Sequence, residues 1–319
     1  MATAAVAQVE FRESPHRTCA WICEQFVGDD PDGGGLALVV PRLQPGAGRI
    51  VVFVDCLPPS GDKPHGESWV FLQVESPEIS DVVRRLDASR FDRMLTYDEH
   101  LLQQHLHAQL FHPFHTYFWV RPPSSATLTV RNHFLPHLTP TNYYCHDGSR
   151  CAFAVSMLCG HKTSTSGHRL RQQVWARQEE IRIPRRFFHS QRTQGELPCF
   201  AGNLPAPADA DKTFLYEDVM FTIAIENQAL PHFFTEKLVD CLVTQTLPIY
   251  CGCTNLDTWL DPRGYIQVTC IEDLLRAVNA LTPQTYAERL PYIQRNHETW
   301  CRVPAFRARL AGALAAKVS

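Results

Sequence analysis

Short apolar runs alternate with amphipathic segments throughout the second half of the chain. The apolar runs have the length of single strands and cover residues 151–159, 218–226, 247–252 and 264–268. The other segments repeat apolar residues every three to four positions, at 167–181, 235–246, 271–281, 283–300 and, in a tail rich in alanine and leucine, 304–317. Continuous apolar runs are typical of strands buried on both faces. Regular strand–helix alternation therefore predicts a parallel sheet covered by helices.

The first half of the chain shows a less regular version of the same pattern. Candidate strands cover 17–22, 36–40, 49–55, 68–74, 91–97 and 116–120, and candidate helices cover 79–91 and 98–109. The proline-rich segment 121–144 has weak periodicity and predicts an inter-domain region. A chain of 319 residues is long enough for two domains. We therefore expect an α/β protein with one domain over 1–135, a second over 136–303 and a final helix in 304–319.

The composition is that of an ordinary globular protein and excludes some partners. Hydrophobic residues make up 45% of the chain, charged residues 20%, and the net charge is −3. This balance does not suit a nucleic-acid-binding protein. No apolar run approaches the ~20 residues of a membrane span, and the N-terminus lacks a basic region followed by an apolar one. We expect no transmembrane segment and a cytoplasmic location.

The chain contains twelve cysteines, which is a high number for a protein of this kind. In a reducing compartment they should be free thiols, most of them buried as small hydrophobic side chains. The nearest approach to a metal-binding pattern is formed by Cys145, Cys151, Cys159 and His161. It lacks the paired C-x₂-C spacing of structural zinc sites, so no metal site is predicted.

Two polar pairs stand at the ends of predicted elements in the second half. Glu226 and Asn227 follow the apolar run that ends at 226, and Gly252 closes the next run. Glu236 and Lys237 open the helix between these runs, and the threonine before them is a suitable N-cap. Ligands of parallel α/β sheets bind beyond the carboxyl ends of the strands. Both pairs are therefore expected to point into one crevice.

The residue types in these pairs suit a nucleotide-sugar. A helix N-terminus attracts phosphate, and Lys237 in the first turn is well placed for a diphosphate. Glu236, Glu226 and Asn227 could accept hydrogen bonds from ribose or sugar hydroxyl groups. The competing interpretation is a capped helix with a surface ion pair. The combination of both pairs with the strand-end positions favours the binding site.

Two further sets of residues have both a functional and an ordinary interpretation. Arg169 and Arg171 lie on the helix of 167–181. An arginine here could bind phosphate oxygens, but two arginines two positions apart cannot face the same way. The ordinary interpretation is a solvated basic face of the helix. Glu75 follows the apolar run at 68–74 and could act as a general base, or be an ordinary loop glutamate. The Asp-x-Asp triplets at 30–32 and 209–211 lie in loops rich in glycine, proline and alanine, and are interpreted as solvated turns.

The stretch "FTIAIENQALPHFFTEKLVDCLVTQTLPIYCGCTNLDTWLDPRGYI", residues 221–266, resembles the donor-domain signature of the α-1,3-fucosyltransferase family, glycosyltransferase family 10. "SMLCGHKTSTSGHRLRQQV" and "WVFLQVESPEISDVVRRLDASRFDRMLTYDE" resemble other segments of that family. The resemblance covers about residues 65–300 and is strongest over 219–266. It implies a GT-B glycosyltransferase, with two Rossmann-like domains facing a cleft. The C-terminal half would hold the nucleotide, and the final helix would pack back on the N-terminal domain.

The resemblance also implies roles for individual residues. Glu75 would be the catalytic base, and a set of side chains in the second half would bind the donor: Arg169, Asn227, Phe233, Glu236 and Lys237. The family usually has tyrosine where Phe233 or Phe234 stands. The implied reaction is an inverting single displacement by a glycan hydroxyl group, without a required cofactor or metal.

The resemblance defines the donor less narrowly than the reaction, because contacts with phosphate and ribose do not distinguish one base or one transferred sugar from another. GDP-fucose is the first choice and UDP-xylose an alternative. A non-catalytic carbohydrate- or nucleotide-binding module with the same fold is the second alternative.

Overall fold

The computed structural model describes residues 6–13, 40–41, 48–112, 152–190, 197–198, 200–206, 212–216, 219–304 and 306–316. The chain divides into two compact units. The N-terminal unit consists of Met1–Pro113 together with Pro304–Ser319, and the C-terminal unit is Phe114–Val303. The expected domain boundary at 135, the proline-rich segment 121–144, and the predicted strands at 17–22 and 116–120 lie outside the described residues.

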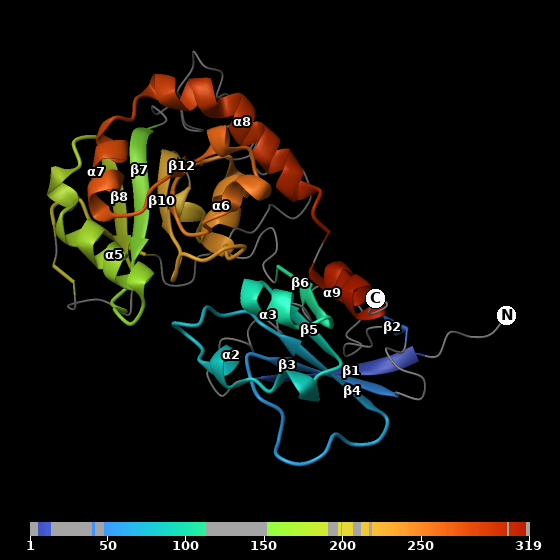
Figure 1. Ribbon diagram of the computed structural model, residues 1–319. Helices are drawn as coiled ribbons and strands as arrows, with labels where there is room; N and C mark the ends of the chain where they lie inside the picture. Colours follow the sequence, from blue (N-terminus) through green and yellow to red (C-terminus); the bar gives the residue numbers. More distant parts are fainter. Residues whose placement is uncertain are drawn as a thin grey trace. The chain divides into compact units, whose positions relative to one another are not determined.

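The sheet of the C-terminal unit is parallel throughout its described strands (Figure 1). The strands are β7 (Ala152–Cys159), β8 (Arg185–His189), β9 (Leu204–Pro205), β10 (Val219–Ile225), β11 (Leu247–Cys251) and β12 (Ile266–Gln267). Their spatial order is β12-β11-β10-β7-β8-β9. Counted from β7 along the chain this is the order 3-2-1-4-5-6 of a Rossmann fold. The strand order therefore reverses between β7 and β10.

Helices cover both faces of this sheet, as Figure 1 shows. One face carries α5 (Ser166–Ala176) and α7 (Ile271–Asn279), and the other carries α6 (Glu236–Thr244) and the C-terminal end of α8 (Pro283–Cys301). Alternate residues of β10 supply the two cores: Ile223 and Ile225 pack with the α5 and α7 side, and Ala224 packs with the α6 side. Short 3₁₀ turns occur at Gln178–Glu180, Lys212–Leu215, Leu256–Thr258 and Pro262–Gly264.

Threonine side chains start three of these helices. Thr165 and Thr282 each form a capping box, at the N-termini of α5 and α8. Thr235 accepts a hydrogen bond from the Lys237 amide at the start of α6. A side-chain oxygen at this position satisfies an amide that has no partner within the helix. The N-termini of α5 and α6 are therefore fixed beside the ends of β7 and β10.

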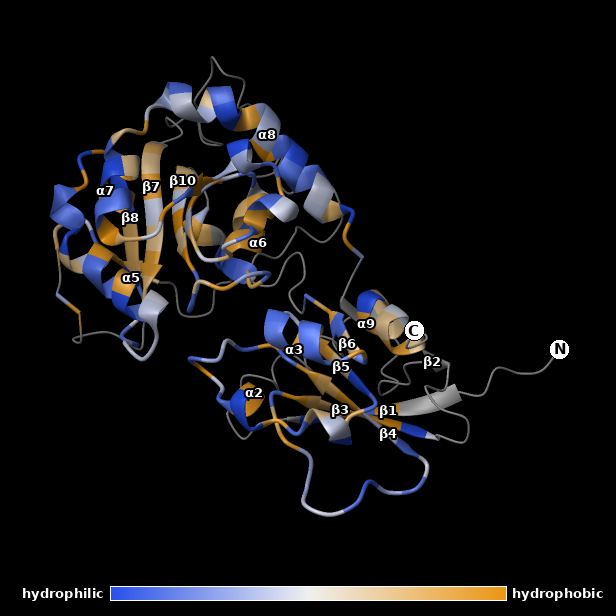
Figure 2. Cartoon of the chain, viewed as in Figure 1, coloured by the Kyte–Doolittle hydropathy of each residue, from blue (hydrophilic) through white to orange (hydrophobic). Residues whose placement is uncertain are grey.

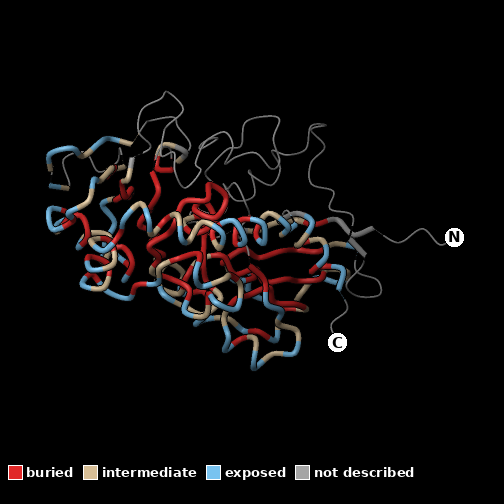
Figure 3. Tube along the Cα trace, turned by 90° about the horizontal axis from the view of Figure 1, so that it is seen from above, coloured by how far each residue is buried: buried red, intermediate tan, exposed pale blue. Residues whose placement is uncertain are grey.

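The N-terminal unit contains a second sheet, with strands β1 (Val6–Glu13), β2 (Val40–Pro41), β3 (Arg49–Val54), β4 (Glu67–Leu72), β5 (Arg93–Thr96) and β6 (Ala108–Leu110). The order is β2-β1-β3-β4-β5-β6, and only β2 runs antiparallel to its neighbour. Figure 2 shows the apolar central strands β3, β4 and β5, and nearly all residues of these strands are buried. Figure 3 shows the buried residues of the described chain in red. Phe53 packs edge-on against Trp69 and Phe91 in the core.

The last helix, α9 (Phe306–Ala315), belongs to the N-terminal unit. Leu310 and Leu314 are buried. The Arg309 guanidinium donates a hydrogen bond to the carbonyl oxygen of His112, and Arg93 donates one to the carbonyl oxygen of Ala316. These contacts fix α9 beside β5 and the end of β6.

Two predicted helices of the first half are wrong in extent. Residues 79–91 form only α2 (Val82–Arg85) and a 3₁₀ turn at Ala88–Arg90, because the Asp87 side chain accepts from the Ser89 amide and replaces a helical bond. Residues 98–109 form α3 (Glu99–Gln104), after which the chain extends and pairs as β6 with β5. Strands β1, β8 and β9 were not predicted from the sequence. No helix within the described part of the chain is long and apolar enough to cross a membrane.

Candidate functional site

A pocket of about 430 Å³ lies in the C-terminal unit where the strand order reverses. Its wall includes Leu158 and Gly160 at the end of β7 and Thr222–Ile225 of β10. In open α/β sheets this reversal leaves a crevice beyond the carboxyl ends of the strands. The first turns of α5 and α6 also face this crevice, through His168 and Lys237.

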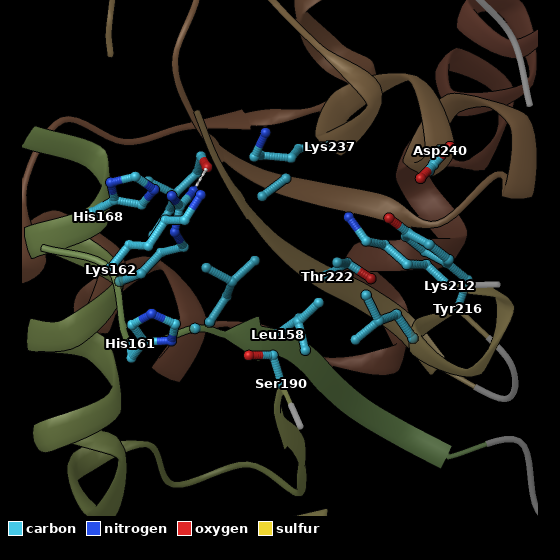
Figure 4. Close-up of a pocket in the computed structure, with 16 residues that line it drawn as sticks. Leu158, His161, Lys162, His168, Ser190, Lys212, Tyr216, Thr222, Lys237 and Asp240 are labelled. Carbon is cyan, nitrogen blue, oxygen red and sulfur yellow. Dashed lines mark hydrogen bonds between the residues drawn. The ribbon is translucent and has the colours of Figure 1, made fainter. Parts of the chain in front are cut away.

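Positive charge predominates around the pocket (Figure 4). Four cationic side chains line it, and they come from different parts of the chain: Lys162, Arg171, Lys212 and Lys237. Asp240 is the one acidic residue among the lining residues. Figure 4 shows His161, Lys162 and His168 on one side, with Lys212, Tyr216 and Asp240 on the other. A compact anion with more than one negative charge suits this arrangement.

Arg171 is the arginine of α5 that reaches the pocket. Its guanidinium donates hydrogen bonds to the carbonyl oxygen of Ile225 and to Asn227 Oδ1, the latter at 2.9 Å. Asn227 therefore holds Arg171 at the strand end, so the structure brings these two predicted residues together. Arg169 is exposed and donates instead to the carbonyl oxygens of Thr163 and Ser164. It does not line the pocket.

Lys237 and Glu236 form an ion pair at the start of α6. Lys237 Nζ lies 3.0 Å from Glu236 Oε1, 3.0 Å from Thr235 Oγ1 and 3.7 Å from Glu226 Oε2. Burial opposes the charged form of Glu236, but Lys237 and Lys212 outweigh it and hold its pKa at about 2. Burial also opposes the charge of Lys237, and the two glutamates outweigh it and raise the Lys237 pKa. Both charges are therefore maintained.

Glu226 and Phe233 lie inside the protein rather than on the pocket wall. Glu226 is 1% exposed, and its carboxylate accepts from the Thr235 amide at 2.8 Å and from Thr235 Oγ1 at 2.6 Å. It therefore holds the loop that starts α6, and it does not offer its oxygens to a hydroxyl group in the pocket. Phe233 is 1% exposed. Gly252 is required here because a Cβ atom would lie 2.5 Å from Glu226 Cγ.

Several pocket residues were missed from the sequence. Lys212 and Tyr216 reach the pocket from a segment distant from both polar pairs, and no local pattern marks them. His168 lies in the first turn of α5, and the sequence predicted a binding role only for the arginines of this helix. Asp240 lies one turn after Glu236 on the face of α6 toward the sheet, and this spacing could have identified it.

Glu75 lies in the N-terminal unit, just beyond the carboxyl end of β4. The buried Asp55 carboxylate accepts hydrogen bonds from the Val74 amide at 3.1 Å and from the Glu75 amide at 2.8 Å. Tyr97 Oη donates to the Glu75 carbonyl oxygen at 2.6 Å. Burial raises the pKa of Asp55 to about 7, the two amides oppose this shift, and the charge of Glu75 adds to it. The Glu75 backbone is thus fixed on both sides of its Cα atom.

The described residues contain no group of three or more histidine, cysteine, aspartate or glutamate side chains that could hold a metal ion. The described cysteines Cys56, Cys159, Cys241, Cys251, Cys253, Cys270 and Cys301 are free thiols.

Part of the C-terminal unit matches a known protein family, and the chain shares its fold with solved structures. Residues 198–310 match the family model "Glycosyltransferase family 10 (fucosyltransferase) C-term". No curated protein matches the chain. A solved α1,3-fucosyltransferase is similar with a TM-score of 0.53 and 14% identity over 91% of this chain and 82% of that one. A solved α1,3-fucosyltransferase with GDP is similar with a TM-score of 0.52 and 13% identity, over 91% of this chain and 83% of that one.

The structural likenesses show a shared fold, with two Rossmann-like domains as in GT-B glycosyltransferases. The family model covers β10, α6 and β11, together with the pocket-lining residues Lys212 and Lys237. Over residues 198–310, the C-terminal unit is thus similar to the C-terminal domain of the fucosyltransferases of glycosyltransferase family 10.

Proposed function

We propose that the protein transfers a sugar from a nucleotide-sugar to a hydroxyl group of a glycan, with inversion at the anomeric carbon. The observation that carries the proposal is the cationic pocket at the reversal of strand order. A nucleotide diphosphate supplies the compact multiple charge that this pocket suits. GDP-fucose is the donor that we propose first, in keeping with the family model and with the α1,3-fucosyltransferase solved with GDP.

In the proposed reaction the pocket residues stabilise the leaving group. As the acceptor oxygen attacks C1 of the donor sugar, the bond from C1 to the diphosphate breaks and negative charge grows on the phosphate oxygens. Arg171 and Lys237, together with the N-termini of α5 and α6, would stabilise that charge. We assign to Arg171 the diphosphate contact that the resemblance had given to Arg169, because Arg171 is the one on the pocket wall.

The proposed general base is Glu75 of the N-terminal unit, which would take the proton of the acceptor hydroxyl group. Its backbone is held by Asp55 and Tyr97, so the point from which its side chain projects is fixed. Fixed geometry of this kind is what general-base catalysis needs. We therefore propose the N-terminal unit as the acceptor side and the C-terminal unit as the donor side.

Calorimetric titration tests the donor half of this proposal. The purified protein would be titrated with GDP, GDP-fucose, UDP, UDP-xylose, UDP-galactose and UDP-glucose. We expect GDP and GDP-fucose to bind and the uridine nucleotides to bind more weakly. Selective binding of UDP and one UDP-sugar would keep the reaction but replace the donor. Binding of none of them would contradict the proposed function and favour a module with the fold alone.

A further inference from the structure

His168 is a polar residue on the wall of the pocket. It is the third residue of α5 and is 7% exposed. Its backbone amide donates to Thr165 Oγ1 at 3.0 Å, and its ring Nδ1 lies 3.3 Å from the Thr165 amide and 3.2 Å from Ser164 Oγ. The ring thus completes the capping box of α5 while also facing the pocket.

The contact with the Thr165 amide fixes which ring nitrogen carries the proton. A backbone amide can only donate, so Nδ1 must accept and has no hydrogen of its own. Burial, together with the neighbouring charges of Arg171, Lys162, Lys237 and Arg169, lowers the pKa of His168 to about 4. The ring is therefore neutral near pH 7. A neutral imidazole without a hydrogen on Nδ1 carries it on Nε2.

The Nε2–H group has no hydrogen-bond acceptor among the residues that the structure describes, since both ring contacts are made by Nδ1. A donor that faces a pocket lined by cations is suited to an anionic oxygen. We propose that His168 Nε2–H donates a hydrogen bond to a phosphate oxygen of the bound nucleotide-sugar. This inference rests on the proposed function for the identity of the ligand.

A neutral donor has an advantage over another cation in this pocket. Arg171 and Lys237 already face the same wall, and an additional positive charge beside them would be repelled in the unliganded protein. A neutral N–H group avoids that repulsion and still forms a strong bond, because its acceptor is charged. The capping interaction also holds the ring in one orientation, so little rotational freedom is lost on binding.

The alternative is that His168 only caps α5, and a matched set of variants separates the two roles. His168→Asn places a side-chain oxygen near the position of Nδ1, which keeps the acceptor for the Thr165 amide and removes the Nε2–H donor. His168→Phe keeps an aromatic ring and removes both. Thr165→Ala is the control, since it removes the other half of the capping box and leaves the imidazole in place.

The measurement is the affinity of each variant for inorganic pyrophosphate and for GDP and UDP, together with its thermal unfolding. We expect His168→Asn and His168→Phe to bind at least about tenfold more weakly than the wild type. Thr165→Ala should have a lower unfolding temperature and an affinity within about twofold of the wild type. Wild-type affinity in His168→Asn, or an equal loss in Thr165→Ala, would overturn the inference.

Failure of the proposed function has a different signature. In that case the wild type itself would bind neither pyrophosphate nor any of the nucleotides. A ¹⁵N-resolved NMR spectrum adds a readout that is independent of activity, with the His168 signal identified by its loss in His168→Asn. We expect a hydrogen on Nε2 in the free protein and a shift of that nitrogen when pyrophosphate is added. A hydrogen on Nδ1, or no shift while pyrophosphate binds, would contradict the inference.

Discussion

Asp55 should make the stability of the N-terminal unit depend on pH in a way that a single substitution removes. The side chain is 1% exposed, and its backbone has a positive φ of 46° at the end of β3. Its pKa is raised from 3.8 to about 7, chiefly because burial disfavours the charged form. The hydrogen bonds from Val74 and Glu75 only partly compensate for that burial.

The sign and size of the effect follow from linkage. Because the folded-state pKa of Asp55 lies above the unfolded value, the folded protein holds the proton more tightly. Its contribution to stability is fully present below about pH 4 and is lost as the pH rises through about 7. A shift of about three pKa units at 1.36 kcal/mol each gives a loss of about 4 kcal/mol. Asp55→Asn resembles the neutral acid and should not show this loss.

The assay must follow the N-terminal unit alone, because a chain of two units need not unfold in one step. Urea unfolding at about pH 5 and about pH 8.5, each followed by a hydrogen-exchange pulse at one fixed pH, reports on the amides of β3 and β4 separately. We expect Asp55→Asn to be more stable than the wild type by about 1.5 kcal/mol at the lower pH, where part of the loss has already occurred, and by up to about 4 kcal/mol at the higher pH.

Asp87→Asn is a suitable control from the same unit. Its carboxylate is exposed, and a hydrogen bond from Ser89 holds its pKa below the ordinary value. Asp87 is therefore ionised throughout this pH range, and the difference between Asp87→Asn and the wild type should not change. If the difference between Asp55→Asn and the wild type is equally constant, then Asp55 ionises normally and the argument from burial is refuted.

Three further predictions concern the proposed reaction. Arg171→Met should weaken GDP binding by roughly 10- to 100-fold, measured by calorimetry, whereas Arg169→Met should leave it unchanged; equal losses would show that the wrong arginine has been assigned. Lys237→Met should weaken GDP binding less than Arg171→Met does, because Lys237 is already paired with Glu236; the reverse order in the same titrations would contradict this reasoning. Glu75→Gln should lower kcat by roughly 10²- to 10⁴-fold while GDP affinity stays at the wild-type value; normal turnover would exclude Glu75 as the base.

The sequence was a good guide to β7, β10 and β11 of the C-terminal unit because these strands are buried on both faces, whereas the more exposed β8 and β9 were not predicted. Their continuous apolar runs indicate buried strands, and the helices between them are long enough to show the helical repeat of apolar residues. The N-terminal unit was less predictable for a physical reason. Its helices are short, and Asp87 and Asp98 make local side-chain bonds that end one segment and start the next. Such bonds compete with helix formation and leave no periodic signal.

For the candidate site, the sequence predicted which polar residues follow the strands but not the directions in which their side chains point. Lys237 lines the pocket and Asn227 contacts Arg171 on its wall, whereas Glu226 turns inward to Thr235 and Phe233 is buried. A sequence indicates that a polar residue follows a strand, whereas the packing of the next loop decides which way its side chain points. Lys212 could not be predicted at all, because its contribution depends on a segment that reaches the pocket from elsewhere in the chain.

The two basic side chains at the centre of the pocket differ in what they must give up when an anion binds. Lys237 is already neutralised by Glu236 at 3.0 Å, with Glu226 nearby, so a phosphate competes with an existing ion pair. Arg171 makes no ion pair within the described residues, and its hydrogen bonds go to the neutral oxygens of Ile225 and Asn227. Burial lowers its pKa, although the more distant charges of Glu226 and Glu236 act in the opposite direction. An arriving diphosphate would supply a direct counter-ion, so Arg171 should contribute more to donor affinity than Lys237.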